Sequence, residues 1–162
     1  MPASKPRRIY FDANVFLAYI SDEPDRADIV QSILAEGARG EIEIITSVVT
    51  IAEVAYGAEE SQTGLNEEGE KAIDELWLPK SPVTLVDVSE TLSRKSRSII
   101  RAAKSDGVRG VRSVDALHLA SAQIHQCDVI FTYEDEKTRA RWQQLTNISV
   151  TEPVTDAPQL GI

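Results

Sequence analysis

Five short apolar segments, separated by stretches long enough to form helices, constrain the fold of this chain more than any other feature. They lie at residues 8–12, 42–46, 83–88, 129–132 and 148–150. Their length and composition predict strands, and a strand–helix–strand order favours parallel pairing. We therefore expect an α/β fold, a three-layer α/β/α sandwich on a mainly parallel central sheet. The 162 residues suit one domain, which we assign to residues 1–152.

The segments between these strands show helical periodicity. We expect one helix to begin near Asn14 and others at 24–39, 48–60, 67–78, 90–105, 114–126 and 135–145, with 61–66 as a loop. Ser89 and Ser113 stand where N-caps are expected. The predicted apolar side of helix 48–60 consists of Val48, Ile51, Ala52, Ala55 and Tyr56. The tail, residues 153–162, is expected to be frayed.

Several classes of protein are excluded by composition. No apolar run approaches the roughly 20 residues needed to span a membrane, and the basic start MPASKPRR lacks the apolar core of a secretory signal. The single cysteine, Cys127, excludes an intrachain disulfide, and with two histidines it leaves too few ligands for a typical structural zinc site. We interpret Cys127 as a small buried apolar residue and expect a cytoplasmic protein.

Acidic residues recur where predicted strands end. Asp12 ends the first strand, Glu53 lies in the first turns of the helix after the second, and Asp115 opens the helix after Gly110. Glu134 and Asp135 directly follow the strand 129–132. In open α/β sheets, ligands bind beyond the carboxyl ends of the strands. These acids therefore share one kind of topological position.

Several carboxylates brought together repel one another and lose hydration, so a divalent cation is the natural partner. An all-oxygen site favours Mg²⁺ or Mn²⁺ over zinc, and two such ions about 4 Å apart can assist cleavage of a phosphodiester. Three of these acids also have a structural interpretation, whereas Asp12, which lies between an apolar strand and an apolar helix face, is the hardest to explain in that way. Asp115 suits the helix dipole, Thr132 and Asp135 have the T-x-x-D spacing of a capping box, and Glu53 could be an exposed helix residue.

The charge distribution points to one polyanion-binding segment on an otherwise acidic chain. Net charge is −9, yet residues 94–112 hold 7 of the 17 Lys and Arg residues and one acid, Asp106. The candidate RNA-binding residues are Arg97, Arg101, Arg109 and Arg112. The alternative for the helical ones is a solvated face, or pairing with the acidic region 53–75.

Four motifs, taken in order, resemble the PIN-domain ribonucleases, especially the VapC-type toxins of toxin–antitoxin pairs. They are IYFDANVFLAYI, ITSVVTIAEVAYG, SVDALHLASA and DVIFTYEDE, spread over roughly residues 8–150. The fourth departs from the family pattern, because Glu134 stands where the family has Asp and Asp135 follows one residue later. We rank Glu134 first and keep Asp135 as the alternate fourth acid.

The resemblance implies a PIN-like α/β/α sandwich and an endoribonuclease that depends on Mg²⁺ or Mn²⁺. It also implies an RNA substrate, homodimerisation and inhibition by a cognate antitoxin. By motif, the catalytic and metal-binding residues would be Asp12, Glu53, Asp115 and Glu134. Asn14 and Thr132 would support them by hydrogen bonds to a carboxylate or to water on the metal.

The sequence also bears on other possible functions. A haloacid-dehalogenase-type phosphatase needs a second acid two residues after the first, but Asn14 stands there, and no glycine-rich nucleotide-binding motif is present. A PIN-fold nuclease of RNA processing without a toxin role, and a catalytically weak RNA- or protein-binding module, both stay open. His118 is interpreted as a core or supporting residue rather than a general base.

Overall fold

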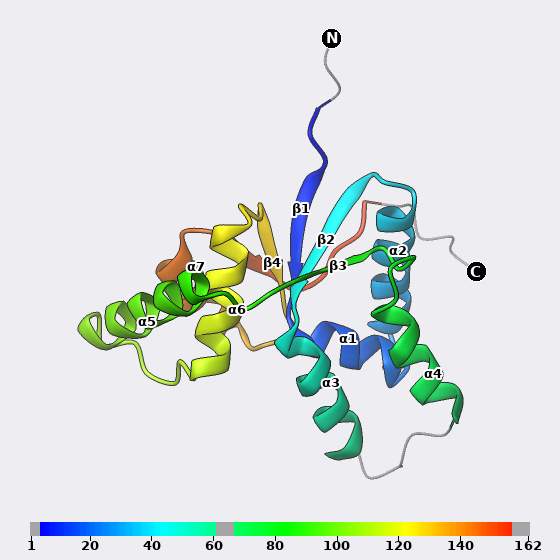
Figure 1. Cartoon of the computed structure of the whole chain (residues 1–162), viewed down its shortest axis with the longest axis horizontal. Helices are drawn as coiled ribbons and strands as arrows, with labels where there is room; N and C mark the ends of the chain where they lie inside the picture. The colour runs from blue at the N-terminus through cyan, green and yellow to red at the C-terminus, as the bar shows by residue number, and fades with distance from the viewer. Residues whose placement is uncertain (1–3, 61–66, 157–162) are drawn as a thin grey trace.

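The computed structural model describes residues 4–60 and 67–156. One sheet of five parallel strands forms its centre, in the order β3-β2-β1-β4-β5 (Figure 1). The strands are β1 (Arg7–Phe11), β2 (Ile42–Ser47), β3 (Val83–Val86), β4 (Val129–Phe131) and β5 (Ser149–Thr151). The predicted fold class and all five predicted strands are confirmed, with strand ends within two residues.

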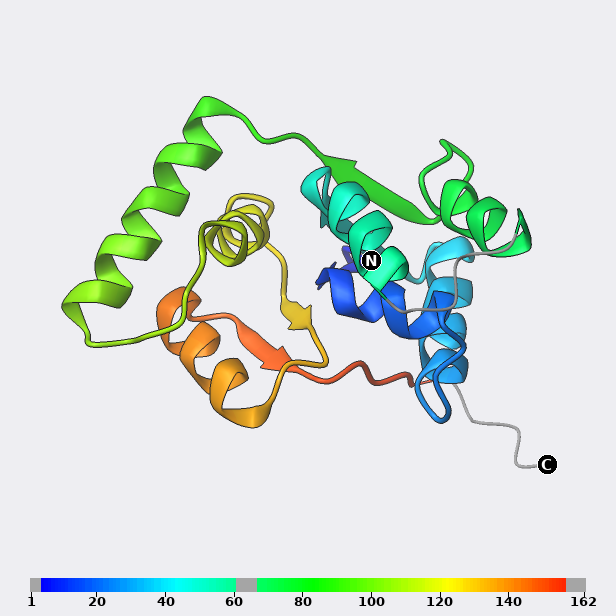
Figure 2. The same ribbon diagram turned by 90° about the horizontal axis from the view of Figure 1, so that it is seen from below.

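Helices cover both faces of the sheet. Those of the described residues are α1 (Ala13–Ile20), α2 (Ala27–Ala38), α3 (Val49–Glu60), α4 (Glu67–Leu76), α5 (Glu90–Ser105), α6 (Ser113–Ile124) and α7 (Glu136–Thr146). Helices α1–α4 lie on one side and α5–α7 on the other (Figures 1 and 2). The chain is thus a three-layer sandwich.

Alternation along β1 explains the two cores. Ile9 and Phe11 pack with α1, α2 and α4, whereas Tyr10 points to the other face and packs with α5, α6 and α7. Both faces of a buried parallel strand are apolar, which is why the strand reads as a continuous hydrophobic run. Cys127 is buried in the second core, and burial raises the pKa of its thiol to about 12, so its interpretation as an apolar core residue is confirmed.

The winding of the sheet reverses beside β1. The chain moves outward from β1 to β2 and β3, then returns to β4 and β5 on the other side of β1. The carboxyl ends of β1 and β4 lie next to each other there, since Phe11 pairs with Phe131. Such a switch point is the usual place for a ligand in an open α/β sheet.

Helix α3 buries a different side from the one predicted. Ile51, Ala52, Ala55 and Tyr56 are exposed, with Ile51 at 38% and Tyr56 at 65% of their full surface, while Val54 is fully buried. Gly57 shows the cause, because a Cβ there would lie 2.7 Å from Leu17 of α1. The helix packs through its glycine, and its larger apolar side chains face outward.

Two helix starts bear on the predicted caps. The Ser89 hydroxyl accepts a hydrogen bond of 3.1 Å from the backbone of Leu92, which confirms it as the N-cap of α5. Ser113 is the first residue of α6 instead of its cap, and Arg112 is the N-cap residue. The predicted helix at 24–39 begins at Ala27, because Asp22 and Asp25 have positive φ angles and form turns before it.

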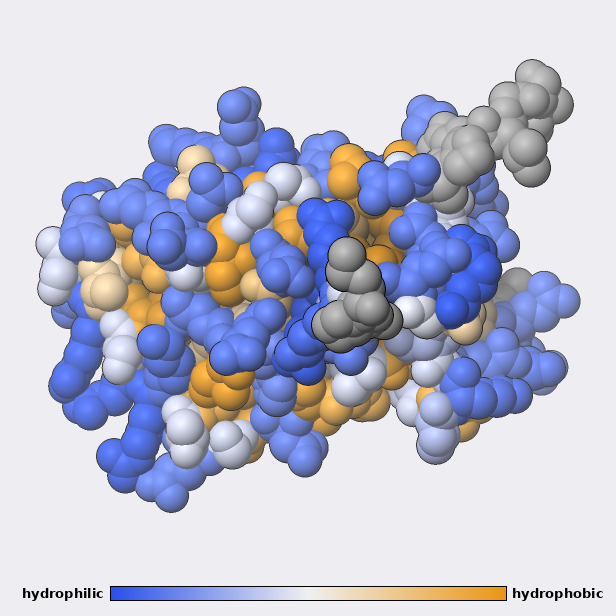
Figure 3. Space-filling view, turned by 90° about the horizontal axis from the view of Figure 1, so that it is seen from above, coloured by the Kyte–Doolittle hydropathy of each residue, from blue (hydrophilic) through white to orange (hydrophobic). Residues whose placement is uncertain are grey.

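The predicted loop at 61–66 and residues 157–162 lie outside the described residues. Of the tail, Thr155 donates a hydrogen bond to Glu36 of α2. No helix in the described part of the chain is long and apolar enough to cross a membrane. Seen from the amino-terminal edge of the sheet, the surface is mostly hydrophilic with apolar patches between (Figure 3).

Candidate functional site

The four predicted acids line one cavity of about 520 Å³ at the carboxyl edge of the sheet, the end seen in Figure 2. The polar residues on its wall are Asp12, Asn14, Glu53, Arg112, Asp115 and Glu134. They come from the ends of β1 and β4 and from α1, α3 and α6, separated by up to 122 residues of sequence. Sequence reasoning therefore located the cavity, although it did not define how each acid is held.

Asp12 lies at the floor of the cavity and is almost completely buried. Its Oδ2 accepts a hydrogen bond of 2.8 Å from the Thr132 hydroxyl, and its Oδ1 accepts one of 2.9 Å from the backbone of Ala13. Burial raises the pKa of Asp12, although the nearby His118 and the hydrogen bond from Thr132 oppose the rise. Asp12 is thus held in a fixed orientation at an electrostatic cost.

Asn14 and Thr132 form a polar bridge between β1 and β4. The Asn14 amide donates to the Thr132 hydroxyl at 3.1 Å, and its carbonyl accepts from the backbone of Tyr133 at 3.0 Å. The backbone of Glu134 also donates to the Thr132 hydroxyl, at 3.2 Å. These contacts give both residues the supporting geometry that we expect of them around Asp12 and Glu134.

Asp115 is the third residue of α6 and is buried. Its Oδ2 accepts a hydrogen bond of 3.0 Å from the backbone of Arg112, and the guanidinium of Arg112 lies 3.3 Å from the same oxygen. Asp115 therefore has the structural role expected of an acid at a helix start, since it accepts a hydrogen bond from a free backbone N–H. It also lines the cavity wall.

Glu53 is linked to the opposite layer through His118. The imidazole Nε2 of His118 is hydrogen-bonded to the Glu53 carboxylate, and it lies 3.7 Å from Oδ1 of Asp12. The Nδ1 of the same ring is 2.6 Å from the Tyr10 hydroxyl. Burial lowers the pKa of His118, but the hydrogen bond to Glu53 and the charge of Asp12 outweigh it, so that pKa is raised.

Glu134 and Asp135 have different surroundings. Glu134 lines the cavity, and burial together with the charges of Asp12 and Asp115 raises its pKa. Asp135 is exposed and is the N-cap of α7, where its carboxylate accepts a hydrogen bond of 2.8 Å from the backbone of Thr138. The predicted capping box from Thr132 is wrong, because the helix begins after Asp135 and Thr132 contacts Asp12 instead.

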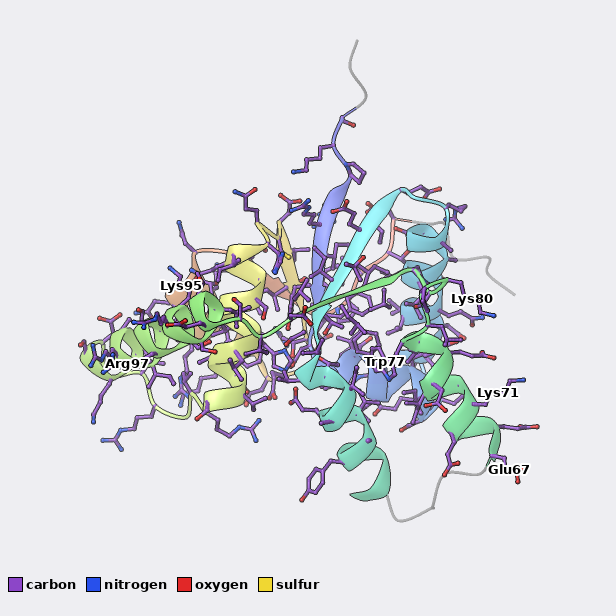
Figure 4. The ribbon with its side chains drawn as sticks, in the orientation of Figure 1. Glu67, Lys71, Trp77, Lys80, Lys95 and Arg97 are labelled. Atoms are coloured by element: carbon purple, nitrogen blue, oxygen red, sulfur yellow. The ribbon has the colours of Figure 1, made fainter. Side chains whose placement is uncertain are left out.

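One of the four candidate RNA-binding arginines lines the cavity, and that residue is Arg112. Arg109 is exposed on the preceding loop, where its carbonyl accepts a hydrogen bond from Arg141. Arg97 and Arg101 are exposed on α5, and Figure 4 shows Arg97 on the outer part of that helix, away from α3. Arg112 therefore lies beside the acids, whereas Arg97, Arg101 and Arg109 lie outside the cavity wall.

The donor set fits a hard divalent cation. All four acids offer carboxylate oxygens, and the raised pKa values of Asp12 and Glu134 show the cost of gathering negative charge there. Within residues 4–60 and 67–156, no three acidic, His or Cys side chains already form a compact metal-binding group. Hydrogen bonds to His118 and Arg112 instead hold Glu53 and Asp115 at the cavity wall.

The family of this chain follows from its match to a sequence model of a protein family. The model of the PIN domain matches residues 9–143 of the chain. The chain belongs to the PIN-domain family. Its predicted resemblance to that family is therefore confirmed, and the match spans all four acids.

Solved structures of PIN proteins share its fold. VapBC2 from Rickettsia felis, bound to a DNA fragment from its promoter, gives a TM-score of 0.66 at 16% identity, covering 90% of this chain and 98% of that one. FitAcB from Neisseria gonorrhoeae gives a TM-score of 0.63 at 19% sequence identity, and the match covers 90% of this chain and 97% of that one. VapC20 from Mycobacterium tuberculosis, a toxin that cleaves the sarcin–ricin loop, gives a TM-score of 0.63 at 15% sequence identity. That match covers 82% of this chain and 94% of VapC20. Among curated proteins, none matches the chain.

Of two polar residues beside the site, Tyr10 was missed from the sequence, whereas His118 was interpreted as a core or supporting residue, which agrees with its burial and its hydrogen bond to Glu53. Tyr10 reads as one more apolar residue of β1, yet its hydroxyl is buried against His118. His118 stands three residues after Asp115, and that spacing puts both on one face of α6. The helical spacing was the available signal for His118, whereas nothing in the sequence singled out the Tyr10 hydroxyl.

Proposed function

We propose that this PIN-domain protein is an endoribonuclease that depends on Mg²⁺ or Mn²⁺ and acts as the cytoplasmic toxin of a toxin–antitoxin pair. The observation that supports this best is the single cavity lined by Asp12, Glu53, Asp115 and Glu134 at the switch point of the sheet. The PIN family match covers the segments that carry all four. The likeness to VapBC and FitAB structures supports the toxin role.

Asp12, Glu53 and Asp115 would hold the first metal ion, and Glu134 would complete the site. When bound, such ions polarise phosphoryl oxygens and lower the pKa of water, which is the chemistry that phosphodiester hydrolysis requires. Thr132 and Asn14 keep Asp12 and the backbone before Glu134 in place. The four carboxylates are the catalytic residues of this proposal.

RNA would approach past Arg112, whose side chain is 72% exposed although its guanidinium contacts Asp115. A guanidinium can pair with a phosphate through two parallel hydrogen bonds. Arg109 on the same loop, and Arg101 and Arg97 on α5, would extend the basic path away from the cavity. Because the whole chain has a net charge of −9 despite this basic segment, its other surfaces would repel RNA and confine it to this path.

Protein partners would use the exposed apolar side of α3. Ile51, Ala52, Ala55 and Tyr56 present this side beside the cavity, which Ala52 and Tyr56 also line. A cognate antitoxin and a second copy of the chain are both proposed as partners, and the similar structures include VapBC complexes bound to DNA. An antitoxin that reached Ala52 and Tyr56 would cover the cavity and block RNA, whereas a second copy would have to leave the cavity open.

Cleavage of total RNA with Mn²⁺ tests the enzymatic part. Wild type should cut RNA, and Asp12→Asn and Asp115→Asn should not. Mn²⁺ should raise the Tm of wild type but not that of the triple variant Asp12→Asn, Glu53→Gln, Asp115→Asn, because only binding to the folded state stabilises it. RNA binding without cleavage by wild type would instead show a catalytically weak binding module.

The toxin part needs a separate experiment. Expression of the wild-type chain should arrest growth, expression of Asp12→Asn should not, and co-expression of the neighbouring small gene should restore growth. Cleavage in vitro without growth arrest would assign the chain to RNA processing.

A further inference from the structure

We propose that His118, held by Tyr10, is a positioning residue that orients the Glu53 carboxylate for metal binding. This inference rests on the proposed function, since it concerns how one of the proposed ligands is arranged. It concerns residues on two different layers of the sandwich, because Tyr10 and His118 belong to the α5–α7 side and Glu53 to the α1–α4 side.

The imidazole of His118 has both nitrogens engaged and is 1% exposed. Its Nδ1 faces the Tyr10 hydroxyl at 2.6 Å, and its Nε2 is hydrogen-bonded to Oε1 of Glu53. A ring with two partners cannot turn without breaking one of these hydrogen bonds. The ring therefore defines where one carboxylate oxygen of Glu53 must lie.

Tyr10 makes this arrangement rigid. Its side chain is completely buried in the second core, and its hydroxyl accepts a hydrogen bond of 3.1 Å from the backbone of Ser47 at the end of β2. A hydroxyl can both donate and accept, so it satisfies the Ser47 amide and His118 together. The position of the imidazole is thus set by two neighbouring strands of the sheet.

Glu53 needs such a restraint more than the other acids do. Asp12 and Asp115 have short side chains that accept backbone hydrogen bonds, whereas Glu53 has an additional rotatable bond and its side chain is 28% exposed. Among the described residues, no hydrogen bond other than that of His118 reaches its carboxylate. Fixing Oε1 on His118 leaves the second oxygen for a cation, so less freedom is lost on binding.

The distance to Asp12 supports the same role. Nε2 of His118 lies 3.7 Å from Oδ1 of Asp12, and the same nitrogen contacts Oε1 of Glu53. The ring therefore lies between two of the proposed ligands. His118 is absent from the cavity wall that these acids form. It therefore acts on the ligands from behind and has no contact with RNA.

Mn²⁺ binding measured by titration calorimetry tests the proposal. His118→Leu removes the donor and keeps similar volume, and we expect Mn²⁺ to bind about 10- to 100-fold more weakly, as is typical when an outer hydrogen-bond partner of a ligand is lost. His118→Gln keeps an amide N–H near Nε2 and should restore most of the affinity. Tyr10→Phe should weaken binding in the same direction and by less.

A matched control separates positioning from stability. Leu119 is adjacent on α6, is fully buried in the second core and is absent from the cavity wall that the acids line, so Leu119→Ala should lower Tm and leave Mn²⁺ affinity unchanged. The Mn²⁺ concentration that gives half-maximal RNA cleavage should rise with the same ranking of variants. This second measurement links the affinity to the reaction.

The outcomes are distinct. Wild-type affinity in His118→Leu, or equal losses in His118→Leu and His118→Gln, would overturn the positioning role while the proposed function stands. If His118→Leu does not fold, unchanged affinity in Tyr10→Phe overturns it equally. Absence of Mn²⁺ binding by the wild type would overturn the proposed function, and this inference with it.

Discussion

The Thr132 hydroxyl donates a hydrogen bond of 2.8 Å to Asp12, and this contact joins the carboxyl ends of β1 and β4 across 120 residues of sequence. The same hydroxyl accepts from the backbone of Glu134 and from Asn14. One small side chain thus satisfies groups from both strands.

Replacing this hydroxyl should cost stability and activity together. Thr132→Val keeps the shape but leaves the buried Asp12 oxygen without its donor, and we expect a loss of about 1–3 kcal/mol in the free energy of unfolding. Urea denaturation measures the loss, and RNA cleavage with Mn²⁺ should fall in parallel. Thr84→Val, the same swap at an exposed threonine on β3 that is absent from the cavity wall, is the control. A Thr132→Val variant as stable as this control would contradict the argument.

Substitutions of the neighbouring acids Glu134 and Asp135 should have different effects on stability and on RNA cleavage. Asp135→Ala removes the N-cap of α7 and should cost about 0.5–2 kcal/mol of stability while cleavage continues. Glu134→Ala should reduce cleavage and Mn²⁺ affinity without loss of stability, because burial and the nearby acids already disfavour its charge. Cleavage assays and urea denaturation of both variants decide the matter. The reverse pattern would make Asp135 the fourth acid.

The metal-free protein should lose stability as pH rises. The pKa values of Asp12 and Glu134 lie above their ordinary 3.8 and 4.5, so in the window above those values the folded chain keeps protons that the unfolded chain has released. The raised pKa of His118 has the same sign: its contribution is complete below 6.5 and is lost as pH rises through the folded value.

The double variant Asp12→Asn, Glu134→Gln isolates the two carboxylates. Its advantage in unfolding free energy over wild type should be smallest near pH 4 and should grow as pH rises, then level off. Urea denaturation in metal-free buffer across this range measures the difference. An advantage that stays constant with pH would show that these two groups do not carry the effect.

Arg112 should contribute to RNA affinity through charge. Arg112→Ala should weaken RNA binding and reduce the salt dependence by about 0.7 in the slope of log affinity against log salt, as expected for one lost phosphate contact on a single strand. Arg39→Ala is the control, because Arg39 pairs with Glu41 at the opposite edge of the sheet. Binding to a labelled RNA at several salt concentrations checks both. Unchanged affinity would remove Arg112 from the substrate path.

The site was predictable to the extent that topology determines it. Parallel strands end at a common edge, so acids placed directly after β1 and β4 had to approach one another, and Asp12 and Glu134 do. Asp115 and Glu53 followed because each lies in the first turns of a helix that starts at that edge.

The rest depended on side-chain contacts that periodicity does not encode. Helix α3 looked amphipathic with Ile51 and Tyr56 inward, but close packing of Gly57 on Leu17 turns the helix so that both face outward. Thr132 looked like a helix cap because of its spacing, yet a buried carboxylate nearby was the stronger acceptor. The Tyr10 hydroxyl was hidden in an apolar strand pattern.

The reversal of winding beside β1 divides the cavity between two halves of the chain. Asp12 and Glu53 precede β3, whereas Asp115 and Glu134 follow it. The part of the chain before β3 and the part that begins with it therefore contain two of the four acids each. A break in the backbone between α4 and β3 would leave each fragment with only two of the acids, and recovery of the proposed nuclease activity would report their reassembly. The architecture thus lends itself to a split reporter, in which the four acids come together only when both pieces meet.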